Sequence, residues 1–190
     1  MLAAGSATRF GSDKLRHELP HGVAIAVQAA RHLRPEIAHV VAVVRPDSPE
    51  LLQTLNNEGC EVVVCDNAAE GMGASLACAA RAAAHSCPDA DGYLIALADM
   101  PFVRRTTIAA VRDALAAGAA LAAPYFRARR GHPVGVSKKY LPDLLALKGD
   151  EGARKLVGEN ERVLIKIPVG DPGVIRDIDT PGDLAPPLRI

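Results

Sequence analysis

The sequence predicts an α/β protein with a three-layer, Rossmann-like fold, in which helices cover both faces of a mainly parallel central sheet. Short apolar runs alternate along the chain with stretches whose apolar residues recur at helical spacing, and this alternation is typical of βαβ units. The apolar runs are continuous, as expected of strands that are covered on both faces. A length of 190 residues fits one domain with a small lobe added to its core.

Four strands and four helices are expected before residue 124. The strands cover residues 39–44, 61–64, 93–98 and 119–123, and the helices cover residues 23–33, 49–57, 74–84 and 106–117. After residue 124 the pattern of alternating strands and helices changes. Short strands are expected at 132–136, 163–168 and 174–178, and helices at 138–147 and 151–157. Thr180 is expected to cap a last helix that has Pro181 at its first position.

Bulk composition argues against several classes of protein. Lys and Arg together number 22, as do Asp and Glu, so a formal net charge of zero gives no general attraction to nucleic acid or to an anionic membrane. No apolar run reaches the roughly 18 residues of a membrane span, and no signal segment opens this sequence. The cysteines lack the close spacing of metal ligands and are expected to be buried free thiols; they are Cys60, Cys65, Cys78 and Cys87. We therefore expect a cytoplasmic protein that binds neither nucleic acid nor a membrane.

The first strand is expected to be short. Only Met1, Leu2 and Ala3 precede the turn at Ala4-Gly5, whereas a strand in a sheet usually has about 5–6 residues. Either this strand is unusually short or further residues lie upstream of this numbering, and a shortened strand would weaken the loop that follows it.

The loop after this strand has the composition of a phosphate-binding site. Ala3-Ala4-Gly5-Ser6 is a run of small residues, which lets backbone N–H groups approach a phosphate. Arg9 and Lys14 follow with Gly11 between them, and two cations beside such a loop suit a triphosphate. The pattern is neither a Walker motif nor the dinucleotide fingerprint. A plain glycine turn with two solvated cations is the alternative that these residues leave open.

Carboxylates at two places are candidates for a metal site. Asp99 follows the apolar run 93–98, and ligands bind at the C-terminal ends of parallel strands in open α/β sheets. Asp177 and Asp179 are two residues apart, so on a strand they would point to the same face. Such carboxylates suit Mg²⁺, which usually takes one or two of them together with substrate phosphates. The alternative is that these side chains cap the turn or helix that follows each of them.

Three further segments, which are expected to include loops, contain glycines or charged residues. They are Glu70-Gly71-Met72-Gly73-Ala74-Ser75-Leu76, the basic segment 127–135 and the segment 149–156. Ser75 is expected near a helix start, where backbone N–H groups can face an anion, although a loop without a ligand is the alternative. The basic segment contains His132 and would suit an anionic second substrate, unless His132 is an ordinary surface side chain. Asp150 is also a candidate cap for the helix expected at 151–157.

The opening loop resembles the signature L-A-A-G-x-x-x-R-x-G-x-x-K of a nucleotidyltransferase family that includes the molybdenum cofactor cytidylyltransferases and molybdopterin-guanine dinucleotide synthase. All seven fixed positions match, and they are Leu2, Ala3, Ala4, Gly5, Arg9, Gly11 and Lys14. The resemblance implies that Leu2, Ala3, Ala4 and Gly5 hold the nucleotide, and that Arg9 and Lys14 hold its phosphates. It also implies a fold of the GT-A type: a single domain over 1–190, with residues 1–123 as its nucleotide-binding part and residues 124–190 as an acceptor-binding lobe.

Two later motifs complete the nucleotide and metal sites that the resemblance implies. Asp99-Met100-Pro101 resembles the family's metal-binding motif, and Asp179 stands before Thr-Pro as a metal-binding Asp does in related sugar-acid cytidylyltransferases. Asp99 and Asp179 are therefore the implied ligands of Mg²⁺, with Asp177 as the fallback. The family's E-G-M-G-x-S-L segment helps form the nucleotide pocket, which implies nucleotide-binding roles for Glu70, Gly71, Ser75 and the strand residue Ala98.

The acceptor site is implied by two narrower motifs. Gly131-His132-Pro133-Val134 and Gly149-Asp150-Glu151-Gly152-Ala153-Arg154 resemble segments that cytidylyltransferases use to receive the pterin cofactor. His132, Asp150 and Arg154 are the implied acceptor-binding residues. Val136 departs mildly from the family pattern, because a Gly-Phe pair is common where Gly135-Val136 stands here.

The resemblance as a whole implies a Mg²⁺-dependent transfer of CMP from CTP to the molybdopterin cofactor, with release of pyrophosphate. Arg9, Lys14 and Asp99 would be the catalytic residues. Ala4 stands where guanylyltransferases tend to carry glycine, which favours the cytidylyl branch. A molybdoenzyme or its maturation factor is expected as a further partner. Two alternatives stay open: transfer with another nucleotide or another phosphorylated acceptor, and a non-catalytic chaperone that binds the cofactor and delivers it.

Overall fold

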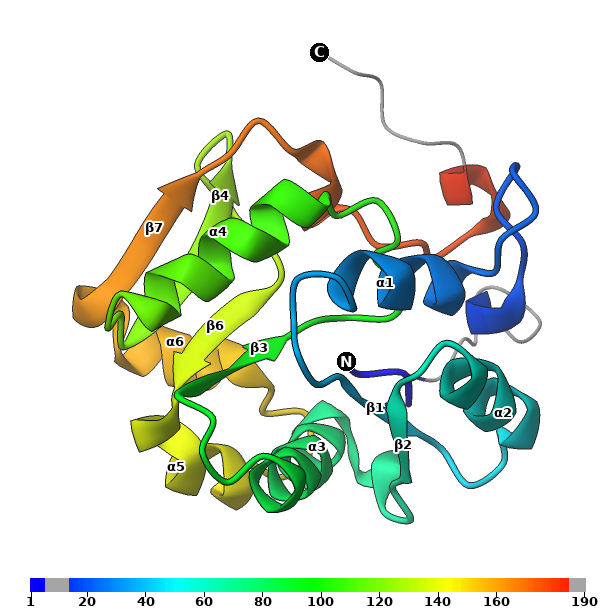
Figure 1. Ribbon diagram of the computed structural model, residues 1–190, viewed down its shortest axis with the longest axis horizontal. Coiled ribbons are helices and arrows are strands. Elements are labelled where there is room, and N and C mark those ends of the chain that lie inside the picture. Colours follow the sequence, from blue (N-terminus) through cyan, green and yellow to red (C-terminus); the bar gives the residue numbers. More distant parts are fainter. Residues whose placement is uncertain (6–13, 185–190) are drawn as a thin grey trace.

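The computed structural model of the chain describes residues 1–5 and 14–184. Figure 1 shows a central sheet with helices packed on both sides of it. One hydrophobic cluster joins the sheet to α1 (Ile25–Leu33), α2 (Pro49–Asn57) and α4 (Arg105–Ala116). A second cluster joins it to α3 (Met72–Ser86), α5 (Leu141–Ala146) and α6 (Ala153–Glu159). The α/β class predicted from the sequence is confirmed.

The sheet is mostly parallel. Its strands are β1 (Val41–Val44), β2 (Glu61–Val64), β3 (Gly92–Ile95), β4 (Leu121–Phe126), β5 (Arg129–Arg130), β6 (Val134–Ser137) and β7 (Leu164–Pro168). Parallel pairs join β1 to β2 and β4 to β7, whereas β6 is antiparallel to both β3 and β4. Leu2 connects the two halves, because it forms parallel bridges with Val43 on one side and with Leu97 on the other. The predicted mainly parallel sheet is thus confirmed, with β6 as an antiparallel strand within it and the short β5 antiparallel to β4.

Local sequence explains why several elements begin and end where they do. Helix α2 starts with Pro49 at its first turn and buries Leu51 and Leu55, which are one turn apart. All four residues of β1 are buried, in keeping with its continuous apolar run. Between β4 and β5 the chain turns through Arg127 and Ala128, which both have positive φ angles of 48° and 64°. The expected basic loop after residue 126 is therefore a tight turn that leads into β5.

The C-terminal segment differs from its prediction. The strand expected at 174–178 is absent from the described residues, where a 3-10 helix covers Pro172–Ile175 and an irregular stretch follows it. The reason lies upstream, because the carboxylate of Asp171 accepts a hydrogen bond from the Gly173 N–H and closes a helical turn. The last helix is one 3-10 turn over Pro181–Leu184, with Pro181 at its start as expected.

The expected boundary at residue 124 falls inside β4, and β6 from the C-terminal part lies between β3 and β4 of the same sheet. The division into a nucleotide-binding part and an acceptor-binding lobe stays a prediction. All four cysteines are free thiols, as predicted; Cys60 and Cys65 are buried and the other two are half-buried. In the described part of the chain, no helix has the length and apolar character needed to cross a membrane.

Candidate active site

Lys14 lies between two carboxylates that come from distant parts of the chain. Its Nζ atom is 3.0 Å from Oδ2 of Asp99 and 3.2 Å from Oδ1 of Asp179. The Lys14 side chain is only 11% exposed, whereas the side chains of Asp99 and Asp179 are 25% and 48% exposed. One ammonium group therefore holds together two carboxylates that remain open to solvent. Three residues that were singled out from separate motifs thus form one cluster.

The backbone fixes where the two carboxylates lie. Asp99 follows Ala98, whose N–H donates to the carbonyl of Leu2 and so extends the ladder beside the opening strand. The carbonyl of Asp99 in turn accepts a hydrogen bond of 2.9 Å from the N–H of Ile178. Ile178 is fully buried, so the segment that carries Asp179 is anchored directly beside Asp99.

A third aspartate, Asp183, holds the backbone around Asp179. Its Oδ2 accepts hydrogen bonds from the N–H of Asp179 at 3.3 Å, from the N–H of Thr180 at 2.8 Å and from the Thr180 hydroxyl at 2.7 Å. These bonds, led by the one from the Thr180 side chain, lower the pKa of Asp183 below its usual value of 3.8. Thr180 was expected to cap the last helix, and here its hydroxyl donates to Asp183 inside that turn. Sequence reasoning gave Asp183 no role, because its function depends on the fold of the turn.

Electrostatics keep Lys14 charged. Burial by itself disfavours the ammonium form and is the largest single influence on its pKa. The attraction and hydrogen bond of Asp99, together with those of Asp179, outweigh burial, and the pKa of Lys14 is raised above 10.5. Lys14 is therefore a charged ammonium group shared by the two carboxylates.

His132 lies close to Asp99, one of the two carboxylates that Lys14 contacts, and its lowered pKa favours the neutral form. Burial lowers its pKa from the usual 6.5, and the nearby charge of Arg130 acts in the same direction. A hydrogen bond to the Ile95 carbonyl and the charges of Asp99 and Asp177 oppose this shift without overcoming it. Nδ1 lies 3.4 Å from the Ile95 carbonyl oxygen, an acceptor, so the proton is assigned to Nδ1 and Nε2 is left as an acceptor. His132 is thus a half-buried side chain near the cluster and not an exposed surface histidine.

The donor set around Lys14 fits a divalent cation. The carboxylates of Asp99 and Asp179 are hard oxygen ligands, and both already face one positive charge. Among the described residues no group of three or more His, Cys, Asp or Glu side chains could hold a metal by itself. A Mg²⁺ ion here would have two protein ligands and would complete its shell with water and phosphate oxygens, which is its usual behaviour. Asp177 is exposed and does not contact Lys14, so the geometry favours Asp179 as the second residue that could hold a metal.

The opening loop and the segment after β2 lie close together. Ala4 belongs to one hydrophobic cluster with Cys65 and Ala68, which directly precede the glycine-rich segment. Ala3 and Ala4 are buried, and Ala3 donates a backbone hydrogen bond to Val43. Gly5 is exposed, and no atom of the residues that the structure describes lies within 4 Å of the position that a Cβ atom would take. Ala3 and Ala4 therefore anchor the start of the loop, and Gly5 is open to solvent.

The glycine-rich segment packs against the loop at residues 148–152. The N–H of Gly73 donates to the carbonyl of Gly149 at 2.7 Å. A Cβ atom on Gly71 would lie 2.4 Å from backbone atoms of Gly149, and one on Gly73 would lie 2.6 Å from the Lys148 carbonyl oxygen. Gly71 also has a φ angle of 125°, which favours glycine. The predicted nucleotide segment and part of the predicted acceptor segment thus pack directly against each other.

The remaining predicted residues are placed as follows. Ser75 is buried at the start of α3, and its hydroxyl donates to the carbonyl of Gly71 at 3.5 Å. Glu70 is exposed and accepts a hydrogen bond from Asn67, and Ala98 is fully buried. Arg154 is exposed on α6. Asp150 is exposed and does not cap α6 through its side chain, because the capping position belongs to Gly152 and has no side-chain hydrogen bond.

Two positions of the opening motif cannot be placed. Arg9 and Gly11 lie outside the described residues, so their predicted roles stay predictions. The roles assigned to the other residues of the nucleotide and acceptor sites also stay predictions, since contact with a ligand defines them.

Asp171 is a second buried feature that sequence reasoning missed. Its carboxylate accepts hydrogen bonds from the Thr107 hydroxyl at 2.7 Å, the Arg104 N–H at 2.8 Å and the Gly173 N–H at 3.0 Å. The turn that it anchors contains Val174, whose carbonyl accepts the N–H of His132. Asp171 therefore helps to position His132, and the only signal in the sequence was an aspartate before Pro-Gly.

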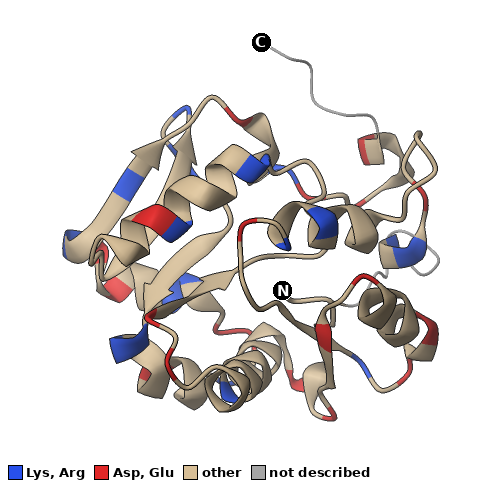
Figure 2. Cartoon of the chain, in the orientation of Figure 1, with Lys and Arg blue, Asp and Glu red and all other residues tan. Residues whose placement is uncertain are grey.

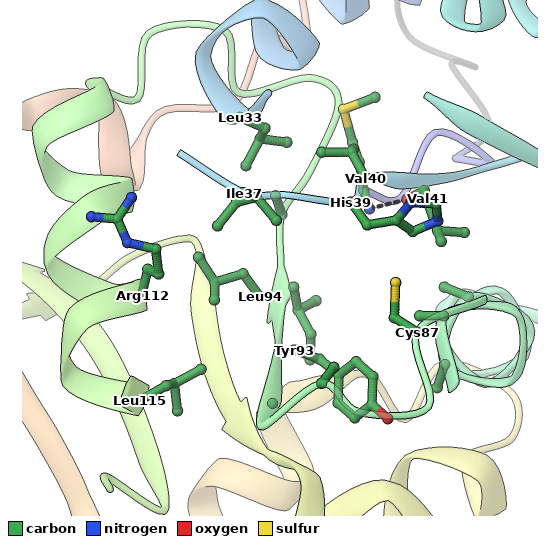
Figure 3. Close-up of a pocket in the computed structure, with 18 of the residues that line it drawn as sticks. Leu33, Ile37, His39, Val40, Val41, Cys87, Tyr93, Leu94, Arg112 and Leu115 are labelled. Carbon is green, nitrogen blue, oxygen red and sulfur yellow. Dashed lines mark hydrogen bonds between the residues drawn. The ribbon is translucent and has the colours of Figure 1, made fainter. Parts of the chain in front are cut away.

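An apolar cavity of about 450 Å³ lies between β1 and β3. Figure 3 shows Val40 and Val41 on one side of it and Tyr93 and Leu94 on the other. Of the predicted site residues that the structure describes, only Leu2 lines this cavity. Figure 2 shows acidic and basic residues interspersed over the helices and loops. The cavity is separate from the Lys14 cluster.

Comparison with known proteins gives consistent matches. A family model described as the MobA-like NTP transferase domain matches residues 1–163. Purine catabolism protein PucB from Bacillus subtilis (strain 168) is 29% identical over 189 residues, which cover 95% of this chain and 90% of that protein.

Solved structures agree on the fold. Rv0371c from Mycobacterium tuberculosis H37Rv superposes with a TM-score of 0.80 and 25% identity over 96% of this chain and 92% of that one. The same protein has also been solved as a complex with manganese. Molybdopterin-guanine dinucleotide biosynthesis protein A from Archaeoglobus fulgidus has a TM-score of 0.64 and 18% identity, over 96% of this chain and 92% of that one, a likeness that shows the fold alone.

Proposed function

Because the chain belongs to the MobA-like NTP transferase domain family, we propose that it is a metal-dependent cytidylyltransferase that joins CMP from CTP to the molybdopterin cofactor. The observation that carries the proposal is the cluster in which Lys14 contacts both Asp99 and Asp179. A triphosphate needs cations, and a metal ion needs hard oxygen ligands. This cluster supplies the cation, Lys14, and the oxygen ligands, Asp99 and Asp179, and Lys14 lies within hydrogen-bonding distance of both carboxylates.

The reaction needs no protein nucleophile. The terminal phosphate of the cofactor has a second pKa near ~6, so at neutral pH most of it is a dianion. One of its oxygens forms a bond to the α-phosphorus of CTP, the bond from that phosphorus to the α–β bridging oxygen breaks, and pyrophosphate leaves with the electron pair. Positioning and charge stabilisation then account for the catalysis. A neutral His132 is consistent with this scheme, because no general base is required.

Each residue of the cluster has a defined task in this proposal. Asp99 and Asp179 hold Mg²⁺, which would supply charge neutralisation at the phosphates when bound. Lys14, with Arg9, binds the phosphates that become the pyrophosphate. His132 uses Nε2 as a hydrogen-bond acceptor toward the incoming cofactor, with Nδ1 fixed by the Ile95 carbonyl. Arg154 contributes a cation from α6 for the acceptor phosphate.

Local features of the structure support the proposed choice of CTP as the nucleotide and of the molybdopterin cofactor as the acceptor. Gly71 and Gly73 bring the start of α3 against the 148–152 loop, which suits two substrates that must meet. Ala4 is buried beside Ala68, so the small side chain favoured by the cytidylyl motif packs under the nucleotide segment. Rv0371c was solved with manganese, which supports a divalent ion at this site while leaving Mg²⁺ as our proposal for this chain.

The experiment that tests the proposal is a pyrophosphate-release assay with purified molybdopterin and each ribonucleoside triphosphate in turn. We expect release with CTP and Mg²⁺ and little with the other triphosphates. Release only with GTP or ATP would keep the transferase site but overturn the choice of nucleotide. Absence of pyrophosphate with every triphosphate, despite binding of the cofactor, would identify a binding or delivery protein instead. A thermal-shift panel supports the assay, because a ligand at about 100 times its dissociation constant stabilises a protein by roughly 2.7 kcal/mol.

A further inference from the structure

The ammonium group of Lys14 occupies the space between the two carboxylates that are the proposed metal ligands. It lies 3.0 Å from Asp99 Oδ2 and 3.2 Å from Asp179 Oδ1. A cation that bridges these same oxygens competes with Lys14 for them and is also repelled by its charge. The ammonium and a metal ion therefore cannot both keep these contacts.

The exposure of the three side chains shows how an exchange would proceed. Lys14 is the most buried of them at 11%, and Asp179 is the most exposed at 48%. An ion can reach the carboxylates from solvent while Lys14 is still in place. The long side chain of Lys14 can then turn toward a phosphate, since a lysine ammonium is a point charge on a flexible stem.

We propose that Lys14 is a stand-in cation for the metal: it neutralises Asp99 and Asp179 in the protein without metal and is displaced toward the triphosphate when the metal binds. This inference rests on the proposed function, because it assumes that these carboxylates bind a metal. It adds that Lys14 lowers the affinity for metal in the absence of nucleotide. A bound triphosphate gives Lys14 another partner and thereby strengthens metal binding.

Asp171 shows that a buried carboxylate in this protein does not need a lysine. Its oxygens accept hydrogen bonds of 3.0 Å or less from the Thr107 hydroxyl and from the backbone N–H groups of Arg104 and Gly173, and the Arg104 guanidinium lies farther away at 3.8 Å. Oδ2 of Asp99 and Oδ1 of Asp179 accept hydrogen bonds from the Lys14 ammonium instead. A single mobile cation can be exchanged for another, whereas a set of fixed backbone and hydroxyl donors cannot.

The first test measures Mn²⁺ binding without nucleotide by electron paramagnetic resonance of the free ion. Lys14→Met should bind Mn²⁺ about tenfold more tightly than the unmodified protein, which is within the usual range of coupling between ligands. Lys155→Met is the matched control, because Lys155 lies on α6 and pairs with Glu151, which is not a proposed metal ligand, and its affinity should be unchanged. Equal or weaker binding by Lys14→Met would overturn the proposal.

The second test needs no substitution and so does not depend on whether the Lys14 variant folds. Amine acetylation of the unmodified protein, read by peptide mass spectrometry, should be slow at Lys14 without metal and several-fold faster with saturating Mn²⁺. Acetylation of Lys155 should not change. A Lys14 rate that Mn²⁺ leaves unchanged would contradict displacement.

The two proposals can fail separately. Pyrophosphate release together with Mn²⁺-insensitive acetylation of Lys14 would leave the transferase function standing and remove the stand-in role. If Mn²⁺ speeds the acetylation of Lys14 but no triphosphate yields pyrophosphate, the stand-in role would be supported and the transferase function removed.

Discussion

Asp171 and Asp179 belong to the same C-terminal segment, yet their carboxylates have opposite surroundings. The side chain of Asp171 is 3% exposed and accepts three short hydrogen bonds from backbone and hydroxyl donors, while the Arg104 guanidinium lies farther away, with Nε 3.8 Å from Oδ1. The side chain of Asp179 is 48% exposed and shares one ammonium group with Asp99. The first carboxylate anchors a turn of the backbone, and the second is the proposed metal ligand. The difference teaches that two aspartates of one segment are given different roles by their surroundings rather than by residue type.

The largest expected effect concerns Asp179. Asp179→Asn should reduce turnover about 100-fold or more, because loss of one directed charge at a transition state usually costs that much. Asp177→Asn is the matched control, since Asp177 is two residues away, exposed and not in contact with Lys14. Steady-state pyrophosphate release is the measurement. Equal losses of turnover in Asp179→Asn and Asp177→Asn would contradict the assignment of Asp179 as the second metal ligand.

Removal of the structural carboxylate should lower stability instead. Asp171→Ala leaves the donors of Thr107, Arg104 and Gly173 without their partner, and the free energy of unfolding should fall by about 3 kcal/mol. Urea unfolding at neutral pH measures the change. The exposed Asp177→Ala serves as control and should change stability by less than about 0.5 kcal/mol. Similar values for both variants would remove the structural role of Asp171.

A smaller effect is expected from His132, which the Asp171 turn positions. Burial lowers its pKa below 6.5 in the folded protein, so the unfolded chain takes up this proton first as the pH falls. The contribution of neutral His132 to stability is therefore complete above pH 6.5 and is lost as the pH falls through the lowered pKa. As the pH is lowered from 7.5, the free energy of unfolding, measured in urea, should fall more in the unmodified protein than in His132→Asn. A pH-independent difference between the two proteins would show that His132 titrates normally.

Much of the fold could be predicted from local sequence. Residues 49–57 and 61–64 were predicted as α2 and β2 with both ends correct, because Pro49 marks a helix start and an apolar run follows a glycine turn. The strand expected at 174–178 was wrong. Its short apolar run carried no information about Asp171, whose carboxylate instead closes a helical turn.

The site was predicted in part. Lys14, Asp99 and Asp179 each came from a recognisable motif, and the structure brings them within hydrogen-bonding distance of one another through Lys14. The sequence predicted Lys14 as a phosphate ligand and gave no sign of its contact with the carboxylates. Asp183 and the packing of Gly71 against Gly149 also depend on contacts that form only in the folded chain. Motif reasoning identifies side chains with the right chemistry, but their partners come from tertiary structure.

The most direct test of the transferase site compares three proteins in one assay: the unmodified chain, Asp99→Asn and Lys14→Ala, each given CTP, molybdopterin and Mg²⁺. Circular dichroism of each protein first establishes that the fold is intact. We predict rapid pyrophosphate release from the unmodified chain and a loss of about 100-fold or more in each variant. Near-normal release from both variants would contradict the assignment of the active site to Lys14, Asp99 and Asp179.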